Sequence, residues 1–454
     1  MGKNLHATDK GNSNPGGHIP GRFTALRALN HRNFRLYFGG QGISIVGTWV
    51  QRIALTWLVY RLTNSAFLLG IVGFSGQIPL LIITPFAGVL ADRLDKHKIL
   101  LYTQALSMIQ AFVLAALVIT NTIQVWEIIF LSIILGVFDA MDMPTRQSFM
   151  VEMVGNNRDD LSNAIAINSS MVNSARLIGP SIAGILISLF GEGWCFLLNA
   201  ISYTAVIFSL LKMEVVHKPV SARKKETLKE LKEGIQYAFG FAPIKSLLLL
   251  LAVVSFMGTP IRILAPVFVK NFFHGGADLF GFLMGASGLG ALTGAIFLMN
   301  RKSVLGLGKL ITYAVLIFGT GLIAFALSHI IILSVIFMFM TGIGMMIQLA
   351  GSNTMLQTIV DNDKRGRVMS LYAMSFRGVA PFGSLLAGAA AGLIGASLTL
   401  IIGGFFCVIS AIYFLFNLPK MRELIRPIYI KYGILPETLQ GVETATRLSF
   451  EEKD

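Results

Sequence analysis

Residues 88–98, GVLADRLDKHK, end one long apolar stretch, Ala66–Ala91, and lead into another, Ile99–Thr120. The hydrocarbon core of a bilayer needs about 20 consecutive apolar residues per helical crossing, so each stretch is long enough to span a membrane. The charged residues between them then form a short loop at one membrane surface. The two stretches are therefore predicted to be consecutive membrane-spanning helices.

The composition of the whole chain is that of a protein dissolved in lipid. Of its 454 residues, 54% are hydrophobic and 13% are charged, whereas a soluble domain carries about 25% charged residues. The apolar residues come in twelve blocks, six on each side of a polar stretch. We predict an all-α membrane protein with twelve transmembrane helices in two six-helix bundles. The predicted spans are Phe34–Tyr60, Ala66–Ala91, Ile99–Thr120, Val125–Met143, Leu161–Phe190, Trp194–Leu211, Ile244–Val269, Leu279–Met299, Leu310–Leu327, Ile330–Gln357, Val368–Ile394 and Ser397–Leu418.

The basic residues are distributed unevenly between the two sides that these spans define. Of the 37 Lys and Arg, 31 lie on the side that holds the N-terminus, two lie opposite and four fall deep within spans. The 31 include Arg35 and Lys245, which are the second residues of their spans on that side. Because loops rich in Lys and Arg stay cytoplasmic, we expect an inner (plasma) membrane protein with both termini in the cytoplasm. The net charge of +14 then reflects topology, and we expect no nucleic-acid partner.

The predicted spans divide the chain into five segments. Cytoplasmic tails cover residues 1–33 and 419–454, and the six-helix bundles cover 34–211 and 244–418. A cytoplasmic linker over 212–243 joins the bundles. Its apolar residues recur at helical spacing between Lys and Glu, which predicts an amphipathic helix on the membrane face.

The two halves repeat a short string at the same offset. SARLIGP (174–180) in the fifth span and SFRGVAP (375–381) in the eleventh each place an Arg four residues before a Pro. Arg176 and Arg377 are 201 residues apart, as are Pro180 and Pro381. Internal repeats of this kind build transporters whose substrate site lies between the halves, near the bilayer midplane.

Three strings give the chain a family resemblance. The loop GVLADRLDKHK closely resembles the signature loop of the major facilitator superfamily, although Asp95 stands where that family usually has a second Gly. The strings DAMDMPTRQSFMVEMV (139–154) and LSNAIAINSSMVNSARLIGPSIAG (161–184) resemble the branch that contains the bacterial enterobactin exporter and the transmembrane secretion effectors. The resemblance covers residues 35–418 and implies secondary active transport by alternating access between the two bundles.

The signature loop is expected to act as a conformational lock. Asp92 lies where a helix meets the cytoplasm, and its carboxylate can bind the N-terminus of another helix or an Arg such as Arg146. That contact would hold the inner helix ends together in one state and break in the other. The alternative is a solvated loop that only sets topology. The lock residues are Gly88, Asp92, Arg93, Lys96 and Arg146.

The fifth and eleventh spans share a motif of Arg, Gly and Pro. Pro removes a helical hydrogen bond and permits bending, and small residues permit close packing. The fifth span resembles the motif of proton-antiporting members of the superfamily, which favours export; the alternative is packing alone. We expect Arg176 and Arg377 to anchor their helices to carboxylates or carbonyls. The motif residues are Arg176, Gly179, Pro180, Gly184, Arg377 and Pro381.

Ionisable residues within spans are costly and mark functional sites by default. Asp139 is the deepest carboxylate, and we expect it to bind the driving proton; the alternative is that it braces the fourth helix. Asp142 and Arg146 are predicted to form a structural i,i+4 ion pair. The family resemblance implies that helices one, four, seven and ten line a central cavity. Its substrate candidates are Gln51, Arg52, Arg262, Gln348 and Asn353, unless Arg52 and Arg262 cap helix ends near the headgroups.

The sequence lacks the motifs of an enzyme. It has no phosphate-binding loop of the Walker type and no metal-ligand spacing among its seven His and two Cys, so we expect no cofactor. The leading hypothesis is a monomeric, proton-coupled exporter of a small organic molecule, either a siderophore-like metabolite or an amphipathic drug. Four intramembrane Arg against two Asp favour an anion. The alternatives are an uptake symporter of the same fold and a membrane receptor or scaffold that no longer transports.

Overall fold

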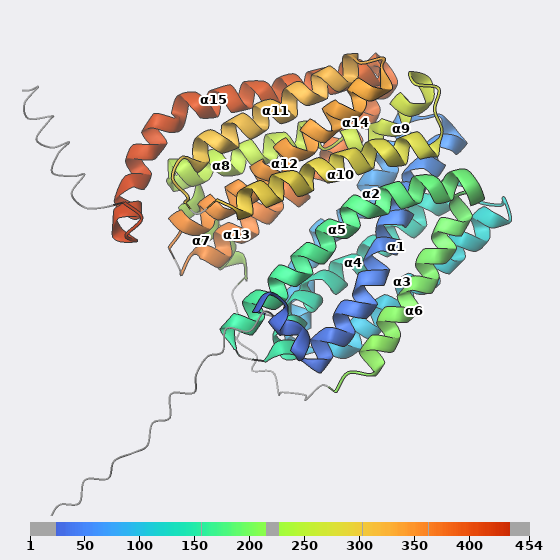
Figure 1. The fold of residues 1–454 in the computed structure, drawn as a ribbon, viewed down its shortest axis with the longest axis horizontal. Coiled ribbons are helices and arrows are strands. Elements are labelled where there is room, and N and C mark those ends of the chain that lie inside the picture. The colour runs from blue at the N-terminus through green and yellow to red at the C-terminus, as the bar shows by residue number, and fades with distance from the viewer. Residues whose placement is uncertain (1–23, 156, 215–226, 302, 362, 436–454) are drawn as a thin grey trace, which may run out of the picture.

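A computed structural model describes residues 24–435, except 156, 215–226, 302 and 362. The surroundings of a few residues inside helices, Gly88, Asp92 and Arg93 among them, also lie outside the described part. The described residues form helices and short turns, with no strand among them (Figure 1). The prediction of an all-α fold is confirmed.

The first half of the chain forms six long helices, preceded by a short 3-10 helix, η1 (Thr24–Asn30). Local signals set several helix ends: Ser65 accepts the Leu68 N–H at the start of α2, and Asp95 accepts two N–H groups at the start of α3. Gly191, with a φ of 85°, forms the sharp turn between α5 and α6 without strain. The six helices are α1 (Arg32–Thr63), α2 (Ala66–Arg93), α3 (Lys96–Ile119), α4 (Val125–Val154), α5 (Arg158–Phe190) and α6 (Glu192–Leu211).

The second half also crosses six times, but π-helical turns interrupt two of its crossings. The seventh crossing consists of α8 (Ala242–Val253), η2 (Val254–Gly258) and α9 (Ile261–Asn271). The eleventh consists of α13 (Arg365–Ala373), η3 (Met374–Gly378) and α14 (Ala380–Ile394). The other four are α10 (Ala277–Met299), α11 (Leu307–Leu327), α12 (Ile331–Ile359) and α15 (Ala396–Lys431).

Length and composition identify eleven crossings among the described residues. Helix α4 is 30 residues long, carries Asp139, Asp142, Arg146 and Glu152 from its middle onward, and packs along α2 and α3, which brings the number of crossings to twelve. The crossings alternate between two sides. We call the side that holds Lys96, Arg146 and Arg367 the basic side; α1 begins there and α15 ends there.

The helices pack into two bundles, α1–α6 and α8–α15, which meet through two pairs of helices, α2 with α14 and α5 with α10. Small residues allow the helix backbones to touch in both pairs: Gly70 lies against Gly388, and Gly184 lies against Gly281. These contacts lie toward the side opposite the basic side. From there the two bundles splay apart toward the basic side (Figure 1).

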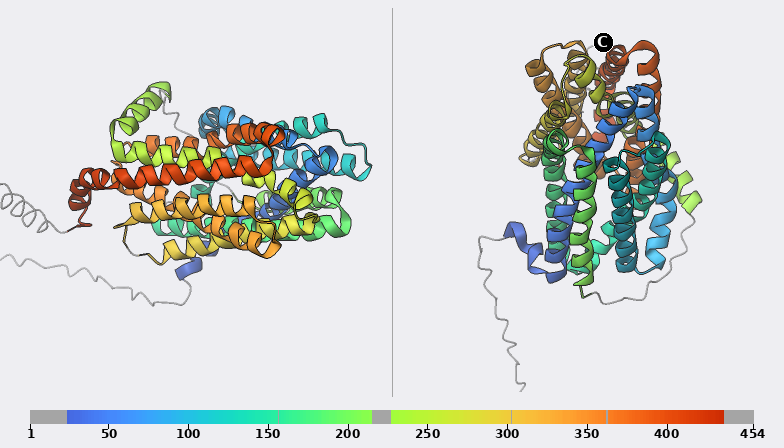
Figure 2. Two further views of the ribbon diagram at one scale, coloured as in Figure 1. Left: turned by 90° about the horizontal axis from the view of Figure 1, so that it is seen from above. Right: turned by 90° about the vertical axis from the view of Figure 1, so that its right-hand side faces the viewer.

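The linker contains α7 (Thr227–Gly240), which stands off the basic-side end of the second bundle (Figure 2, left). Polar contacts fix it there. Glu233 pairs with Arg367 at 2.7 Å, and the Tyr237 hydroxyl donates to the Asp361 carboxylate at 3.2 Å. The linker helix is therefore attached to the second bundle at the start of its eleventh crossing.

Candidate substrate and coupling site

Five charged side chains meet at the boundary between the two bundles, and electrostatic interactions link them across it. Four are positive and one is negative. Three come from the first bundle and two from the second. We call them the central cluster: Arg52 of α1, Asp139 of α4, Arg176 of α5, Arg262 of α9 and Arg377 of η3.

An ion pair joins Arg52 to Asp139, with 3.2 Å between Nη2 and Oδ2. Both residues lie far from the ends of their helices, yet their side chains are 52% and 41% exposed. Water screens an ion pair of this exposure, so the pair holds its partners only weakly. Asp139 can therefore exchange Arg52 for a proton or another partner.

Trp49 connects Arg52 to the fifth helix. The guanidinium carbon of Arg52 lies 5.6 Å from the centre of the Trp49 ring, and that of Arg176 lies 5.5 Å from it. Both distances are in the range of cation–π attraction. Gly179 makes room for this arrangement, because a Cβ at that position would collide with the Cβ of Trp49.

The two arginines of the second bundle contact methionine sulfur atoms. Arg262 donates to Sδ of Met345 on α12 at 3.3 Å, and Arg377 donates to Sδ of Met143 on α4. The second contact crosses the bundle boundary. A thioether is a weak acceptor, so neither guanidinium has its charge compensated by this contact.

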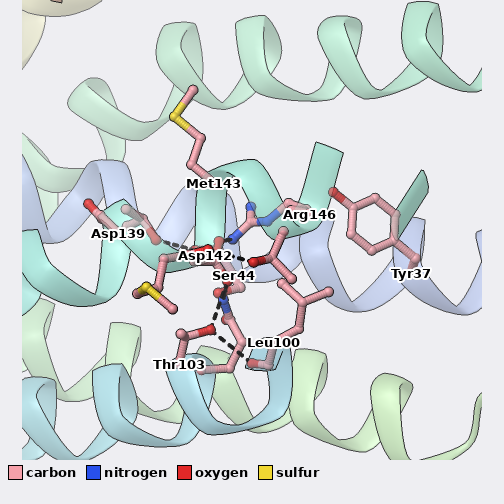
Figure 3. Close-up of polar contacts among 12 residues, drawn as sticks. Tyr37, Ser44, Leu100, Thr103, Asp139, Asp142, Met143 and Arg146 are labelled. Carbon is pink, nitrogen blue, oxygen red and sulfur yellow. Dashed lines mark hydrogen bonds and ion pairs between the residues drawn. The ribbon is translucent and has the colours of Figure 1, made fainter. Parts of the chain in front are cut away.

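Asp142, one turn from Asp139 on α4, lies in a different environment (Figure 3). Its buried carboxylate accepts hydrogen bonds from Thr103 at 3.1 Å, from Gln104 at 2.7 Å and from Arg146. The predicted i,i+4 ion pair of Asp142 with Arg146 is thus present. Asp142 braces α4 against α3, and Asp139 is the more exposed of the two aspartates of this helix.

The predicted cavity residues lie in two different environments, the central cluster and the interior of a bundle. Arg52 lies inside α1, and Arg262, the second residue of α9, lies inside the seventh crossing; neither is at the outer end of its crossing, and both join the central cluster. Gln51 was predicted to line the cavity but lies buried inside the first bundle, bonded to Gln110 and Asn199. Its neighbour Arg52 points elsewhere because successive helical residues are about 100° apart.

The two candidates on the tenth span, α12, are also placed differently from each other. Gln348 is only 1% exposed and lies inside the second bundle, so the prediction that it lines the cavity is wrong. Asn353 is half-buried, accepts a hydrogen bond from Gln357 and interacts with Tyr372 of the eleventh crossing.

Three of the predicted lock residues, Gly88, Asp92 and Arg93, have surroundings that lie outside the described part of the structure. Of the other two lock residues, Lys96 pairs with Glu152 at 2.7 Å, which ties the start of α3 to the end of α4. Arg146 pairs with Asp142. The contact between Asp92 and Arg146 stays a prediction.

The Arg, Gly and Pro motif of the fifth and eleventh spans lies at the boundary between the bundles. The Pro180 carbonyl and Gly184 lie against Gly281 of α10, and Pro381 is the second residue of α14, directly after η3. The expected anchoring of Arg176 and Arg377 is not found. Among the described residues, neither guanidinium is bonded to a carboxylate or carbonyl, because both extend into the central cluster.

Several features of the site had no clear signal in the sequence. These are the Trp49 ring between two guanidinium groups, the methionine contacts and the two π-helical turns. The turns contact each other, since the Ser255 hydroxyl of η2 donates to the Phe376 carbonyl of η3. π-Helical turns often mark functional sites, and η3 carries Arg377. The repeated string that contains Ser375, Phe376 and Arg377 was the sequence signal that could have pointed to η3.

A membrane fold of two six-helix bundles, with charged side chains at their boundary, defines a secondary transporter. The family model for transmembrane secretion effectors matches residues 23–429. The chain belongs to this family, within the major facilitator superfamily.

Three relatives with assigned roles are similar over most of their length. The staphyloferrin A transporter of Staphylococcus aureus is 28% identical, over 86% of this chain and 97% of the relative. The multidrug efflux pump Tap of Mycolicibacterium fortuitum is 25% identical, over 85% and 93%. The enterobactin exporter EntS of Shigella boydii is 26% identical, over 79% and 85%.

Solved structures support the fold. The nucleoside transporter NupG superposes with a TM-score of 0.66 at 14% identity, over 86% of this chain and 99% of that chain. A peptide transporter of the POT family superposes with a TM-score of 0.68 at 13% identity, over 87% and 95%. At this identity the likeness concerns the fold alone.

Proposed function

We propose that this protein is a proton-coupled exporter of a small anionic molecule of the siderophore class. The observation that carries the proposal is the central cluster, in which four arginines and one partly exposed carboxylate lie at the boundary between the bundles. Arg52 is paired with Asp139, so the remaining positive charges of Arg176, Arg262 and Arg377 are available to a multiply charged anion. Arginine binds carboxylates and other oxyanions through two parallel hydrogen bonds. The siderophores named for two relatives agree with this choice.

The proposal assigns the basic side to the cytoplasm. The structure is then an inward-open state, because the bundles touch near the opposite side and splay toward the basic side. In this state Asp139 interacts electrostatically with Arg377 of the second bundle as well as with its ion-pair partner Arg52. When the bundles rock to open outward, Arg377 moves with the second bundle, and Asp139 binds a proton more readily. A proton taken up outside is thus released inside, as antiport requires.

The same geometry defines the competing symport mechanism. A substrate that takes Arg52 away from Asp139 leaves the carboxylate unpaired, which favours protonation, so substrate and proton would bind together. In an antiporter, substrate binding to the purified protein leaves bound protons unchanged or releases them. Calorimetry in buffers of different ionisation enthalpy separates the two mechanisms, and proton uptake on binding would support the symporter.

A second candidate substrate class is amphipathic drugs, and the surroundings of the cluster favour it. Trp49, Met143 and Met345 all contact cluster arginines. Methionine is flexible and polarizable, and such surfaces adapt to many apolar ligands. The multidrug relative is consistent with this class.

Transport into everted membrane vesicles tests the proposal. Vesicles acidified inside should accumulate staphyloferrin A or enterobactin, and a protonophore should abolish accumulation. A lipophilic cation, such as ethidium, should not compete. Accumulation of the cation but of neither siderophore would establish a drug pump instead. A folded protein that moves none of these compounds, and accelerates no exchange, would support the receptor or scaffold alternative.

A further inference from the structure

A chain of hydrogen bonds connects the backbones of the two central-cluster arginines of the second bundle. The Arg262 N–H donates to the Thr259 carbonyl at 3.1 Å, and the Thr259 hydroxyl donates to the Ser255 carbonyl at 2.6 Å. The Ser255 hydroxyl donates in turn to the carbonyl of Phe376, the residue directly before Arg377. The chain therefore runs from the seventh crossing to the eleventh without a break.

Two prolines explain why hydroxyl groups take part in this chain. In a π-helical turn a carbonyl accepts from the N–H five residues ahead, and proline has no N–H to donate. Pro260 lies five residues after Ser255 of η2. Pro381 lies five residues after Phe376 of η3. Neither carbonyl therefore has a π-helical N–H partner, and a hydroxyl group donates to each.

The Ser255 hydroxyl joins two crossings instead of serving its own helix. Thr312 and Thr320 of α11 donate to the carbonyl four residues earlier in the same helix, which is a common pattern for hydroxyl groups in helices. Ser255 is fully buried, so water cannot replace the hydrogen bond that its hydroxyl makes. Removal of this hydroxyl would leave the Phe376 carbonyl short of a donor, which is costly in a buried site.

Close packing also fixes the turn that contains Ser255. Gly383 of α14 lies against η2, and a Cβ at this position would collide with the Phe256 carbonyl. Gly403 of α15 lies against the next carbonyl, that of Met257, in the same way. The backbone of η2 thus touches both following crossings, and the hydrogen bond from Ser255 adds a directional contact to this packing.

We propose that Ser255 is a positioning residue for the anion site. It holds the two π-helical turns together and thereby fixes Arg262 and Arg377 relative to each other. The second bundle then presents two guanidinium groups as one preformed unit, which an anion with two oxyanionic groups contacts at once. Arg176 lies outside this unit, on the continuous helix α5 of the first bundle. The role in substrate binding rests on the proposed function, whereas the coupling of the two turns does not.

Backbone hydrogen exchange in the purified full-length protein tests the coupling. Ser255→Ala should make exchange about tenfold faster in peptides that cover 374–378, although the substitution lies on another crossing. Ser255→Thr, which keeps a hydroxyl, should restore slow exchange. Ser334→Ala is the matched control, because Ser334 is equally buried in the second bundle and its hydroxyl has no partner among the described residues. Unchanged exchange in Ser255→Ala, or an equal rise in Ser334→Ala, would overturn the inference.

Affinity for staphyloferrin A tests the effect on the site. Ser255→Ala should weaken binding about tenfold, through displacement of the arginines. Its loss should be less than additive with that of Arg377→Gln and additive with that of Arg176→Gln. Unchanged affinity, or additive losses in both combinations, would overturn the positioning role. If neither staphyloferrin A nor enterobactin binds while exchange responds as expected, the proposed function fails and the coupling of the turns stands.

Discussion

Replacing Asp139 with Asn tests whether this carboxylate couples transport to protons or only braces helix α4. The change keeps the size of the side chain and removes its charge and its ability to bind a proton. Asp142 provides the matched control on the same helix, because Asp142→Asn is the same chemical change one turn away. Only Asp142 is buried within a full set of hydrogen-bond partners.

The expected loss of stability differs between the two variants. At 3.2 Å, the Coulomb energy of the Arg52–Asp139 pair is about 1.3 kcal/mol in bulk water and about 5 kcal/mol at an effective dielectric constant of 20. Exposed fractions of 52% and 41% place the pair near the lower value, and ordering of the side chains offsets part of it. Asp139→Asn should therefore cost less than about 1 kcal/mol of unfolding free energy.

Asp142→Asn should cost more. Its side chain is 8% exposed and that of Arg146 is 23% exposed, so the substitution leaves a largely buried guanidinium without its counter-charge. Breaking one side of a buried pair costs about 3–5 kcal/mol. Unfolding in a denaturing-detergent titration gives both values.

Transport then shows which carboxylate couples. Proteoliposomes that contain Asp139→Asn should lose uphill export driven by a pH gradient and keep substrate exchange at equilibrium. Asp142→Asn should lower protein yield and reduce both activities together. Uphill export by Asp139→Asn with an unchanged response to a protonophore would refute the assignment. A stability loss as large as that of Asp142→Asn would refute the reasoning about exposure.

Three further predictions concern topology, the lock and the bundle boundary. Cysteines introduced at Lys98 and Thr122 should differ in labelling by an impermeant thiol reagent added outside cells; labelling of Lys98→Cys alone would reverse the orientation. Asp92→Asn should impair transport in a protein that still folds and inserts, and normal export would exclude the lock. Gly281→Leu should push α10 away from α5, because a Cβ there meets the Pro180 carbonyl at 2.6 Å. Distances between spin labels on the two bundles, placed at the membrane side opposite the basic side, should lengthen. Unchanged distances would contradict this close contact.

The sequence alone predicted the membrane crossings well, because each depends on a local property. The first predicted span, Phe34–Tyr60, lies within α1, and the seventh, Ile244–Val269, lies within the crossing from Ala242 to Asn271. Transfer of an apolar helix into lipid depends on the sum over about 20 residues, which a single chain segment supplies. The repeated strings around Arg176 and Arg377 likewise indicated two related halves.

The sequence could not predict how each helix is rotated about its axis. In a soluble protein the polar face of a helix marks the outside, but lipid and the bundle interior are both apolar, so this signal is weak in a membrane. Gln51 and Arg52 are adjacent polar residues, and only packing placed one inside the first bundle and the other in the central cluster.

The sequence by itself determined that this chain crosses a membrane in two related halves and which ionisable residues lie within the crossings. Only the tertiary structure decided which of those residues meet. Arg377 reaches Met143 from a helix that is more than 200 residues away along the chain. Asp139 contacts Arg52 of α1, whereas Asp142 contacts Gln104 of α3. The physical reason is that the charge state and exchangeability of a carboxylate depend on the groups around it, and these groups come from several helices.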